Sequence, residues 1–316
     1  METALRKNLR KTAISGSDAM RRILVTGAAG YIGRNLCSHL LNNGYEVTGS
    51  LLNEKEAELL PEGVNPVMTG AISGKTDWSE ALEGADGVVH LAAIVHKKET
   101  QDKATEDLFR RTNTDATAAL AKQALEKKIR SFVFLSTVAV YGVNKTTEPL
   151  TVNSPINPIT YYGKSKWEAE QQLTALFEKA DASLTIFRPT MVYGPKAPGN
   201  FARLTKMVRM GIPLPLGSVN NKRYFVFIEK LVSLISEGLE RDKPGIDVRF
   251  ACDDKPLSTK ELVQIAAQWE GKQAWIFPFP SSVLHFCLSC AGKNDEWDKL
   301  GEDYLVQIPA DHNADS

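Results

Sequence analysis

Two side chains are spaced so that they can exchange a proton with a bound molecule. Tyr162 and Lys166 stand four positions apart in YYGKSK, and residues at that spacing share one face of a helix. A free phenol has a pKa of about 10, and a neighbouring ammonium favours the phenolate. We therefore expect Tyr162 to act as an acid/base whose pKa is lowered by Lys166. Tyr161 points about 100° away around the helix and cannot share that partner. The alternative is a solvated helix face.

A second group of residues is typical of phosphate binding. The segment ILVTGAAGYIG carries three glycines between an apolar run and a segment of helical length. Such glycines allow a tight turn, close approach of a pyrophosphate and close helix packing, while the helix N-terminus supplies amide donors. An ordinary turn between a strand and a helix is the alternative. We predict a dinucleotide site whose contacts in this loop are Gly27, Gly30, Tyr31, Ile32, Gly33 and Arg34.

The elements that must position these groups alternate along the chain. Strands are predicted at 22–26, 45–50, 64–68, 87–92, 131–136 and 184–188, and helices at 31–43, 77–84, 104–128 and 160–180. This alternation predicts an α/β fold with a doubly wound parallel sheet, whose ligands bind beyond the carboxyl ends of the strands. After about residue 189, Pro- and Gly-rich loops surround short helices. We expect a dinucleotide-binding domain at 21–188 and mainly a smaller substrate-binding lobe at 189–316.

Composition and charge narrow the class of protein. Lys+Arg and Asp+Glu are 38 each, so no net field attracts nucleic acid or an anionic membrane. No run approaches the roughly 18 apolar residues of a membrane helix. Four cysteines in 316 residues do not make a disulfide framework, and the pair Cys287 and Cys290 lacks the partners of a zinc site. We expect a soluble cytoplasmic protein without a bound metal, preceded by a disordered leader at 1–20.

Four further motifs follow the glycine loop in order: HLAA at 90–93, FLSTVAVYG at 134–142, YYGKSK at 161–166 and RPTMVYGP at 188–195. With the G-x-x-G-x-x-G spacing, they resemble the extended short-chain dehydrogenase/reductase family, the NAD-dependent epimerases and dehydratases, over residues 21 to about 265. The resemblance implies a Rossmann fold in which Lys166 also holds the nicotinamide ribose. It implies that Thr137, with Ser136 as the alternative, bonds the reacting oxygen and that Asn113 supports the site. It further places Leu91, Ala92 and Ala93 at the cofactor.

The sequence leaves the choice between NAD and NADP open. An NAD enzyme is expected to carry an acid after the second strand, and an NADP enzyme a base. Leu51 and Leu52 stand there instead, and Ala71 replaces an Asp that the family often has near the adenine. Arg34 is a candidate partner of a 2′-phosphate.

The C-terminal portion carries the resemblance to one group of the family. NFARLTKMVRMGIPLPLGSVNNKRYFVFIEKL resembles bacterial enzymes that reduce or epimerise UDP-linked N-acetylamino sugars. The resemblance implies that Asn200 and Arg223 contact a nucleotide diphosphate, a suitable task for an amide and a guanidinium. We therefore expect hydride transfer at sugar carbon 4, and favour a 4-ketosugar reductase over a 4-epimerase.

A protein of another class is the alternative: a Rossmann regulator that senses dinucleotides without turnover. The missing acid or base at Leu51 and Leu52 speaks for it, whereas the Tyr162/Lys166 pair speaks against it, because a sensor has no need of an activated phenol. For either class we expect a homodimer, formed by pairing of the helices at 104–128 and 160–180 with their copies.

Overall fold

A seven-stranded parallel sheet forms the centre of the molecule. The computed structural model describes residues 21–95, 102–241 and 243–308. The strands run in the order β3-β2-β1-β4-β5-β6-β9, and all six neighbouring pairs are parallel. Their bounds are β1 (Arg22–Thr26), β2 (Glu46–Leu51), β3 (Val64–Met68), β4 (Gly87–His90), β5 (Ser131–Leu135), β6 (Ser183–Pro189) and β9 (Gly245–Ala251). The doubly wound α/β fold predicted from the sequence is confirmed. The leader predicted at 1–20 lies outside the described residues.

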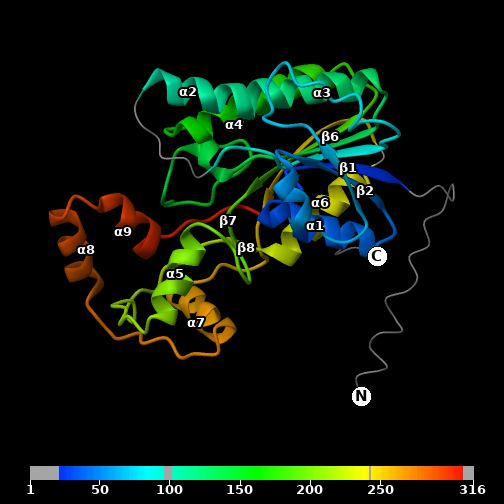
Figure 1. Cartoon of the computed structure of the whole chain (residues 1–316). Helices are drawn as coiled ribbons and strands as arrows, with labels where there is room; N and C mark the ends of the chain where they lie inside the picture. Colours follow the sequence, from blue (N-terminus) through cyan, green and yellow to red (C-terminus); the bar gives the residue numbers. More distant parts are fainter. Residues whose placement is uncertain (1–20, 96–101, 242, 309–316) are drawn as a thin grey trace, which may run out of the picture.

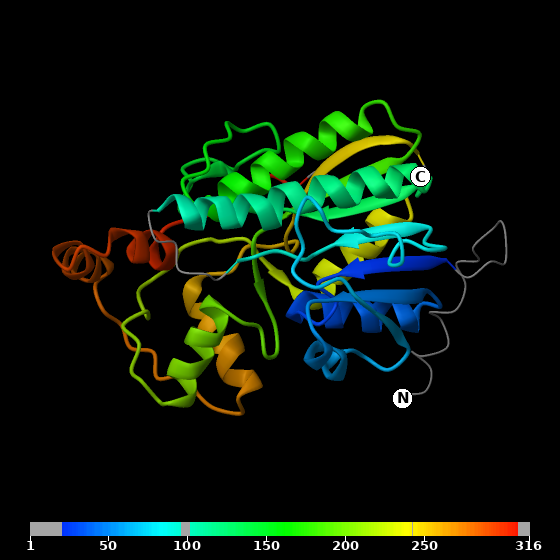
Figure 2. The ribbon, with the colours of Figure 1, turned by 45° about the horizontal axis from the view of Figure 1, so that its top comes forward.

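Helices cover both faces of the sheet (Figures 1 and 2). On one face, α1 (Tyr31–Asn42) and α6 (Ile228–Leu239) bury apolar side chains against Ile23 and Val25 of β1. On the other, α3 (Ala116–Glu126) and α4 (Tyr161–Phe177) pack over Leu24. Successive residues of β1 thus enter opposite cores, as the period of two in a strand requires. Because both faces are covered, the inner strands β4, β5 and β6 are buried at every position.

Two predicted helices differ from the structure. The segment 104–128 is divided into α2 (Lys103–Phe109), the π-helical segment η3 (Arg110–Asp115) and α3. The prediction of a helix at 77–84 is wrong: Leu82 N donates to Trp78 O, but the turn is not continued, and Gly84 follows with φ +68°. A single turn gains too few hydrogen bonds to continue as a helix unaided. Trp78 and Leu82 are nevertheless fully buried in the core beneath α3.

The sequence after residue 189 builds a second core and then returns to the sheet. The helices α5 (Asn200–Arg209) and α7 (Thr259–Trp269) enclose this core below the sheet in Figure 1, beside the short parallel pair β7 (Met191–Tyr193) and β8 (Phe225–Phe227). Two further helices, α8 (Ser281–Cys290) and α9 (Asn294–Gly301), lie to the left of that view. Between these elements, α6 and β9 belong to the central sheet and its covering layer. The division into a cofactor domain and a substrate lobe stays a prediction.

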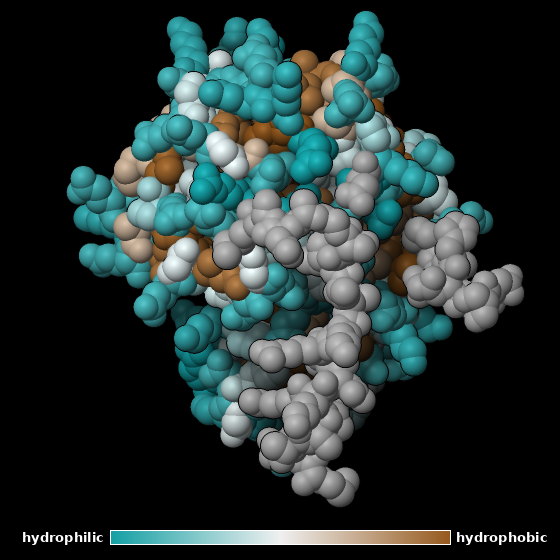
Figure 3. All heavy atoms as spheres, turned by 90° about the vertical axis from the view of Figure 1, so that its right-hand side faces the viewer, coloured by the Kyte–Doolittle hydropathy of each residue, from teal (hydrophilic) through white to brown (hydrophobic). Residues whose placement is uncertain are grey.

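The surface at the amino ends of the strands is mainly hydrophilic. Figure 3 shows the side of the molecule on which β1 starts. The hydrophobic residues, drawn in brown, form separate patches there among hydrophilic ones. The carboxyl ends point the other way, toward α5 and α7 (Figure 2).

Candidate active site

A cavity of about 1160 Å³ lies beyond the carboxyl ends of the strands. Its wall combines the glycine loop after β1, the segments after β2, β3 and β4, and the start of α5. Twelve of the residues predicted to form the site line it: Gly27, Gly30, Tyr31, Ile32, Gly33, Leu91, Ala92, Ala93, Thr137, Tyr162, Lys166 and Asn200. The site residues predicted from separate motifs therefore meet in one place. Arg34, Asn113 and Arg223 do not line the cavity.

The glycine loop has the geometry of a phosphate cradle. Gly27 has φ +68°, and a Cβ built on it would lie 2.9 Å from Ala92 N, so the loops after β1 and β4 touch through backbone. A Cβ on Gly33 would lie 2.2 Å from Gly27 O. A Cβ on Gly30 would instead meet only Gly27 O, at 3.1 Å, because this residue faces the cavity at the start of α1. The loop thus offers helix-terminal amides at a surface free of side chains, which fits a dinucleotide pyrophosphate.

Tyr162 and Thr137 form the polar centre of the cavity wall. The Tyr162 hydroxyl and the Thr137 side chain are hydrogen-bonded to each other. Although part of the Tyr162 ring is exposed to the cavity, protein atoms surround its hydroxyl end. Burial raises the pKa of Tyr162 to about 12, against the smaller lowering effect of the hydrogen bond to Thr137. The expectation that Lys166 lowers this pKa is therefore wrong for the protein's own groups.

Burial also disfavours the charged form of Lys166. Its side chain is 2 % exposed, and its Nζ lies 4.3 Å from the centre of the Phe134 ring. Burial lowers the pKa of Lys166 to about 7, although the carboxylate of Glu170 acts in the opposite direction. An ammonium that is close to losing its proton at neutral pH does little to favour a phenolate beside it.

Asn113 lies behind the wall and joins two segments of the site. Its Oδ1 accepts from Ile94 N at 2.8 Å, and its Nδ2 donates to Ile94 O at 3.0 Å and Ser165 Oγ at 3.0 Å. Ser165 Oγ in turn donates to Tyr162 O at 2.9 Å. The loop after β4 is thus tied to the first turn of α4. Asn113 stands in the π-helical segment, a kind of irregularity that often marks functional sites.

His90, at the end of β4, continues this network toward the glycine loop. Thr26 Oγ1 accepts from Leu91 N and Ala92 N, so its own proton must point to His90 Nδ1, 2.7 Å away. At the other ring nitrogen, Thr117 Oγ1 donates to Asn113 O and so accepts from Nε2–H. Both ends require a neutral ring protonated on Nε2. Burial, and then the charge of Lys166, lower the pKa of His90 to about 3, in agreement with that state.

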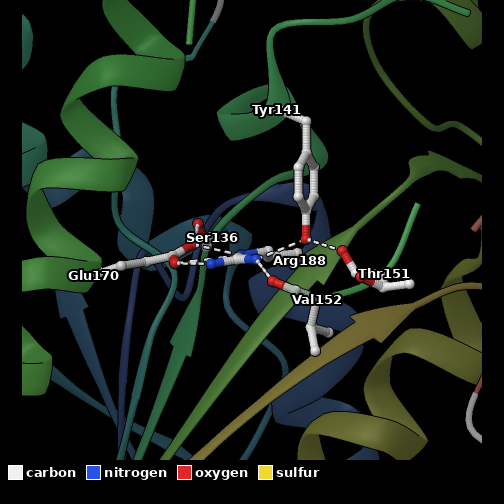
Figure 4. A network of polar contacts seen from close by, with 6 residues as sticks. All are labelled: Ser136, Tyr141, Thr151, Val152, Glu170 and Arg188. Carbon is white, nitrogen blue, oxygen red and sulfur yellow. Dashed lines mark hydrogen bonds and ion pairs between the residues drawn. The ribbon is translucent and has the colours of Figure 1, made fainter. Parts of the chain in front are cut away.

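Glu170 of α4 and Arg188 of β6 form a buried ion pair (Figure 4). Arg188 and Glu170, with side chains 5 % and 2 % exposed, approach to 2.6 Å between Nη2 and Oε2. Glu170 also accepts from Ser136 Oγ. Ser136, the alternative to Thr137 for the reacting oxygen, is therefore already engaged.

The other side of Arg188 faces Tyr141 (Figure 4). Arg188 Nη1 donates to Tyr141 Oη at 2.6 Å and to Val152 O at 2.9 Å. Sequence reasoning assigned no task to Glu170 or Arg188. The spacing of Tyr162, Lys166 and Glu170, four residues each, was the available signal, since it places a carboxylate on the same buried face of α4.

Two predicted ligand contacts lie elsewhere. The guanidinium of Arg223 donates to three backbone carbonyls, at Asp298 and Glu302 (both 2.8 Å) and at Asn144 (3.1 Å). These contacts fasten the C-terminal segment and do not support a diphosphate contact for Arg223. Arg34 is half-buried on α1, outside the cavity wall.

No group of three His, Cys, Asp or Glu side chains suited to a metal ion occurs within the described residues. Cys287 and Cys290 are exposed free thiols on α8.

Sequence comparisons show which known proteins this chain is similar to. The model of the NAD dependent epimerase/dehydratase family matches residues 23–248. A UDP-glucose 4-epimerase of Vibrio cholerae is 35% identical over 91% of this chain and 88% of its own length. An N-acetyl-α-D-glucosaminyl-diphospho-ditrans,octacis-undecaprenol 4-epimerase of Escherichia coli O157:H7 is 28% identical over 86% of this chain and 80% of its own length.

Solved structures agree with the fold. A UDP-N-acetylglucosamine 4-epimerase from Bacillus cereus superposes with a TM-score of 0.72, at 18% identity, over 93% of this chain and 92% of that one. A UDP-glucuronic acid 4-epimerase from the same organism, in complex with NAD, gives a TM-score of 0.69 at 22% identity, over 91% and 90% of the two chains. At these identities the likeness is one of architecture.

Proposed function

Because the chain belongs to the NAD-dependent epimerase/dehydratase family, enzymes of the extended short-chain dehydrogenase/reductase type, we propose that it transfers a hydride at carbon 4 of a UDP-linked sugar, with Tyr162 as the acid/base. The observation that carries the proposal is the meeting of Tyr162, Thr137 and Lys166 with the glycine cradle on one cavity. A regulator that only senses a dinucleotide needs the cradle but not the phenol.

The cavity fits NAD by its own chemistry. The amides at the start of α1, with Gly30 leaving their approach open, suit the pyrophosphate, and Lys166 lies where it can hold the nicotinamide ribose. When bound, NAD supplies the acceptor and the donor of the hydride. The protein supplies position and the movement of one proton.

Tyr162 moves that proton. The oxidation step starts with Tyr162 as the phenolate: the sugar hydroxyl gives its proton to the phenolate oxygen as the hydride leaves the same carbon, so a carbonyl and the neutral phenol form. In the reduction step Tyr162 returns the proton to the carbonyl oxygen as the hydride comes back. Thr137, already bonded to Tyr162, holds the reacting oxygen beside the phenol. Asn200 lies at the start of α5 and on the cavity wall, which supports its proposed contact with the nucleotide diphosphate.

Whether the hydride returns to the other face of the same sugar separates an epimerase from a reductase. The motifs of the C-terminal portion favoured a 4-ketosugar reductase. The names of the two relatives, both 4-epimerases and one at 35% identity over nearly the whole chain, favour the epimerase. We therefore propose 4-epimerisation as the reaction and UDP-glucose or a UDP-N-acetylhexosamine as its substrate.

Product analysis tests the proposal. Purified protein is incubated with NAD and UDP-glucose or UDP-N-acetylglucosamine, and the 4-epimers are resolved by chromatography while NADH absorbance is followed. Epimer formation without net NADH change supports the proposal, and Tyr162→Phe should abolish most of it. A parallel incubation supplies a UDP-linked 4-keto sugar and NADH, and turnover only there, with one NADH consumed per product, would assign the reductase. Dinucleotide binding without turnover of any of these sugars would favour the regulator.

A further inference from the structure

The end of β2 lacks the acidic residue that, in NAD enzymes, usually accepts hydrogen bonds from the adenosine ribose. Leu51 is buried and Leu52 is 53 % exposed, and neither side chain can accept a hydrogen bond from a hydroxyl. Both residues, with Ser50, nevertheless line the cavity beside the glycine loop. That is where an open α/β sheet of this order receives the adenosine half of a dinucleotide.

A carboxylate reaches this place from one turn further along the chain. The segment η2 (Glu54–Leu59) begins after Asn53, whose side chain accepts from Lys55 N at 3.1 Å. The turn brings Glu56 back over the strand end, where its Oε2 accepts from Leu52 N at 2.8 Å. Glu56 is half-buried and lines the cavity, whereas its neighbours Glu54 and Glu58 are exposed and do not. Its second oxygen, Oε1, accepts no hydrogen bond from the described residues.

We infer that Glu56 accepts the adenosine ribose hydroxyls of NAD and selects against the 2′-phosphate of NADP. The inference rests on the proposed function, because it assumes that the cavity binds a dinucleotide. It makes Glu56 a residue that determines cofactor specificity, in place of the acid missing at the end of β2.

The charges around the cavity point the same way. Among the described residues, those that line it and carry charge are Glu56, Arg111 and Lys166. Lys166 belongs to the catalytic end, beside Tyr162, and Arg111 comes from the π-helical segment. Arg34 and Lys55, the cations nearest in sequence to the two loops, do not line it. A phosphate dianion at the end of β2 would therefore face a carboxylate, whereas two hydroxyls would find an acceptor.

Titration calorimetry with NAD and with NADP tests the inference on three proteins: wild type, Glu56→Gln and Glu54→Gln. The glutamine oxygen can still accept from Leu52 N, so Glu56→Gln removes the charge and keeps the turn. Glu54→Gln removes the same charge from the same segment outside the cavity, and so controls for the overall field. We expect wild type to prefer NAD, and Glu56→Gln to reduce the ratio of the two affinities by about ten- to hundredfold, while Glu54→Gln leaves it unchanged.

Four outcomes would overturn the inference. Equal ratios in Glu56→Gln and Glu54→Gln would show that the carboxylate does not discriminate. Tighter binding of NADP by wild type, abolished in Arg34→Gln, would assign the 2′-phosphate to Arg34. Binding of neither dinucleotide to the wild type would overturn the proposed function together with the inference. A general loss of structure in Glu56→Gln would weaken NAD and NADP alike and leave their ratio unchanged, which also counts against it.

Discussion

At the scale of single residues, burial disfavours the charged form of both members of the catalytic pair. The pKa of Tyr162 is raised to about 12 and that of Lys166 is lowered to about 7, each chiefly because protein replaces water. The helix spacing correctly placed both residues on the cavity wall, but spacing carries no information about solvation. In the proposed reaction, the positive nicotinamide ring of bound NAD must supply the attraction that Lys166 does not. The phenol should therefore titrate at lower pH with NAD than without it, as tyrosinate absorbance, corrected with Tyr162→Phe, can show.

Removal of the phenol oxygen is the direct test of Tyr162. Tyr162→Phe should leave binding of NAD and of the sugar nucleotide nearly unchanged and lower turnover by about a hundred- to ten-thousandfold, the usual effect of losing an acid/base. Tyr161→Phe is the matched control and should cost little, because Tyr161 does not line the cavity. Equal losses in the two variants, measured as kcat, would contradict the assignment.

Substitutions at two glycines of the cradle should have different effects, one on NAD binding and the other on stability. Gly30→Val should abolish NAD binding in calorimetry and change the melting temperature little, since its side chain would enter the cavity. Gly33→Ala should unfold the protein at lower temperature, because its Cβ would lie within 2.2 Å of Gly27 O. If Gly30→Val binds NAD as wild type does, the cradle is misassigned.

His90 should make the stability depend on pH. The folded pKa is about 3 and the unfolded value about 6.5, so the unfolded chain binds more protons below about 6.5. The stabilisation is complete above that pH and is lost as the pH falls toward 3, with a slope of up to about 1.4 kcal/mol per pH unit. Urea unfolding over this range should show a shallower slope for His90→Gln than for wild type.

A second measurement covers the case in which His90→Gln does not fold. Nuclear magnetic resonance of the wild-type imidazole should show a neutral ring protonated on Nε2 at every pH well above its folded pKa of about 3. Titration near the ordinary histidine value would contradict the network of Thr26, His90 and Thr117.

At the scale of elements, the Glu170–Arg188 pair connects α4 to the sheet. Glu170 lies on α4, Arg188 on β6, and Ser136 follows β5, so the pair fixes the helix that carries Tyr162 against two strand ends. Two buried charges are costly to bring out of water, and the pair is stable only because each oxygen and nitrogen has a partner.

Replacing one partner of this pair should therefore lower the free energy of unfolding more than replacing both. Glu170→Gln should lower the free energy of unfolding by about 3 to 5 kcal/mol, because it leaves the Arg188 charge buried without a counter-ion. The double variant Glu170→Gln/Arg188→Met should recover part of that loss. Denaturant titrations of the two proteins provide the comparison, and a double variant less stable than the single one would contradict this reading of the pair.

Elements with strong local patterns were predictable, and those decided by long-range packing were not. The glycine loop, β1, β5 and the helix that starts near Tyr161 carry their own signals in turn chemistry and period. β9 was missed because it is an edge strand, with Asp247 and Arg249 in place of the apolar run of an inner strand. Asn113 forms hydrogen bonds with residues that lie 19 and 52 positions away in the sequence, and a local sequence pattern carries no information about such contacts. For the same reason no local pattern distinguishes Glu56 from its neighbours Glu54 and Glu58.

At the scale of the whole molecule, the expected dimer stays a prediction. It was based on apolar surface left by the helices at 104–128 and 160–180. Among the described residues, the large exposed hydrophobic side chains lie elsewhere, for example Trp275 and Phe286 at 64% and 68% exposure, and none is on α3 or α4. Light scattering at micromolar concentration should give twice the chain mass if those helices pair, and a monomer would refute the prediction.

None of the described helices is long and apolar enough to cross a membrane. A cytoplasmic location stays a prediction, which fractionation of cells that produce the protein would test.

The strand order of the sheet has a consequence for synthesis on the ribosome. In the sheet β6 pairs with β5 on one side and with β9 on the other, and β9 leaves the ribosome 56 residues after β6. At bacterial rates of about 5 to 20 residues per second, the β6 edge waits roughly 3 to 11 s for its neighbour. During that time a nascent chain presents the unpaired backbone edge of SLTIFRP, a kind of surface that promotes aggregation with neighbouring chains and on which chaperones act. Expression of this protein should therefore be limited by how well the cell shields that one strand.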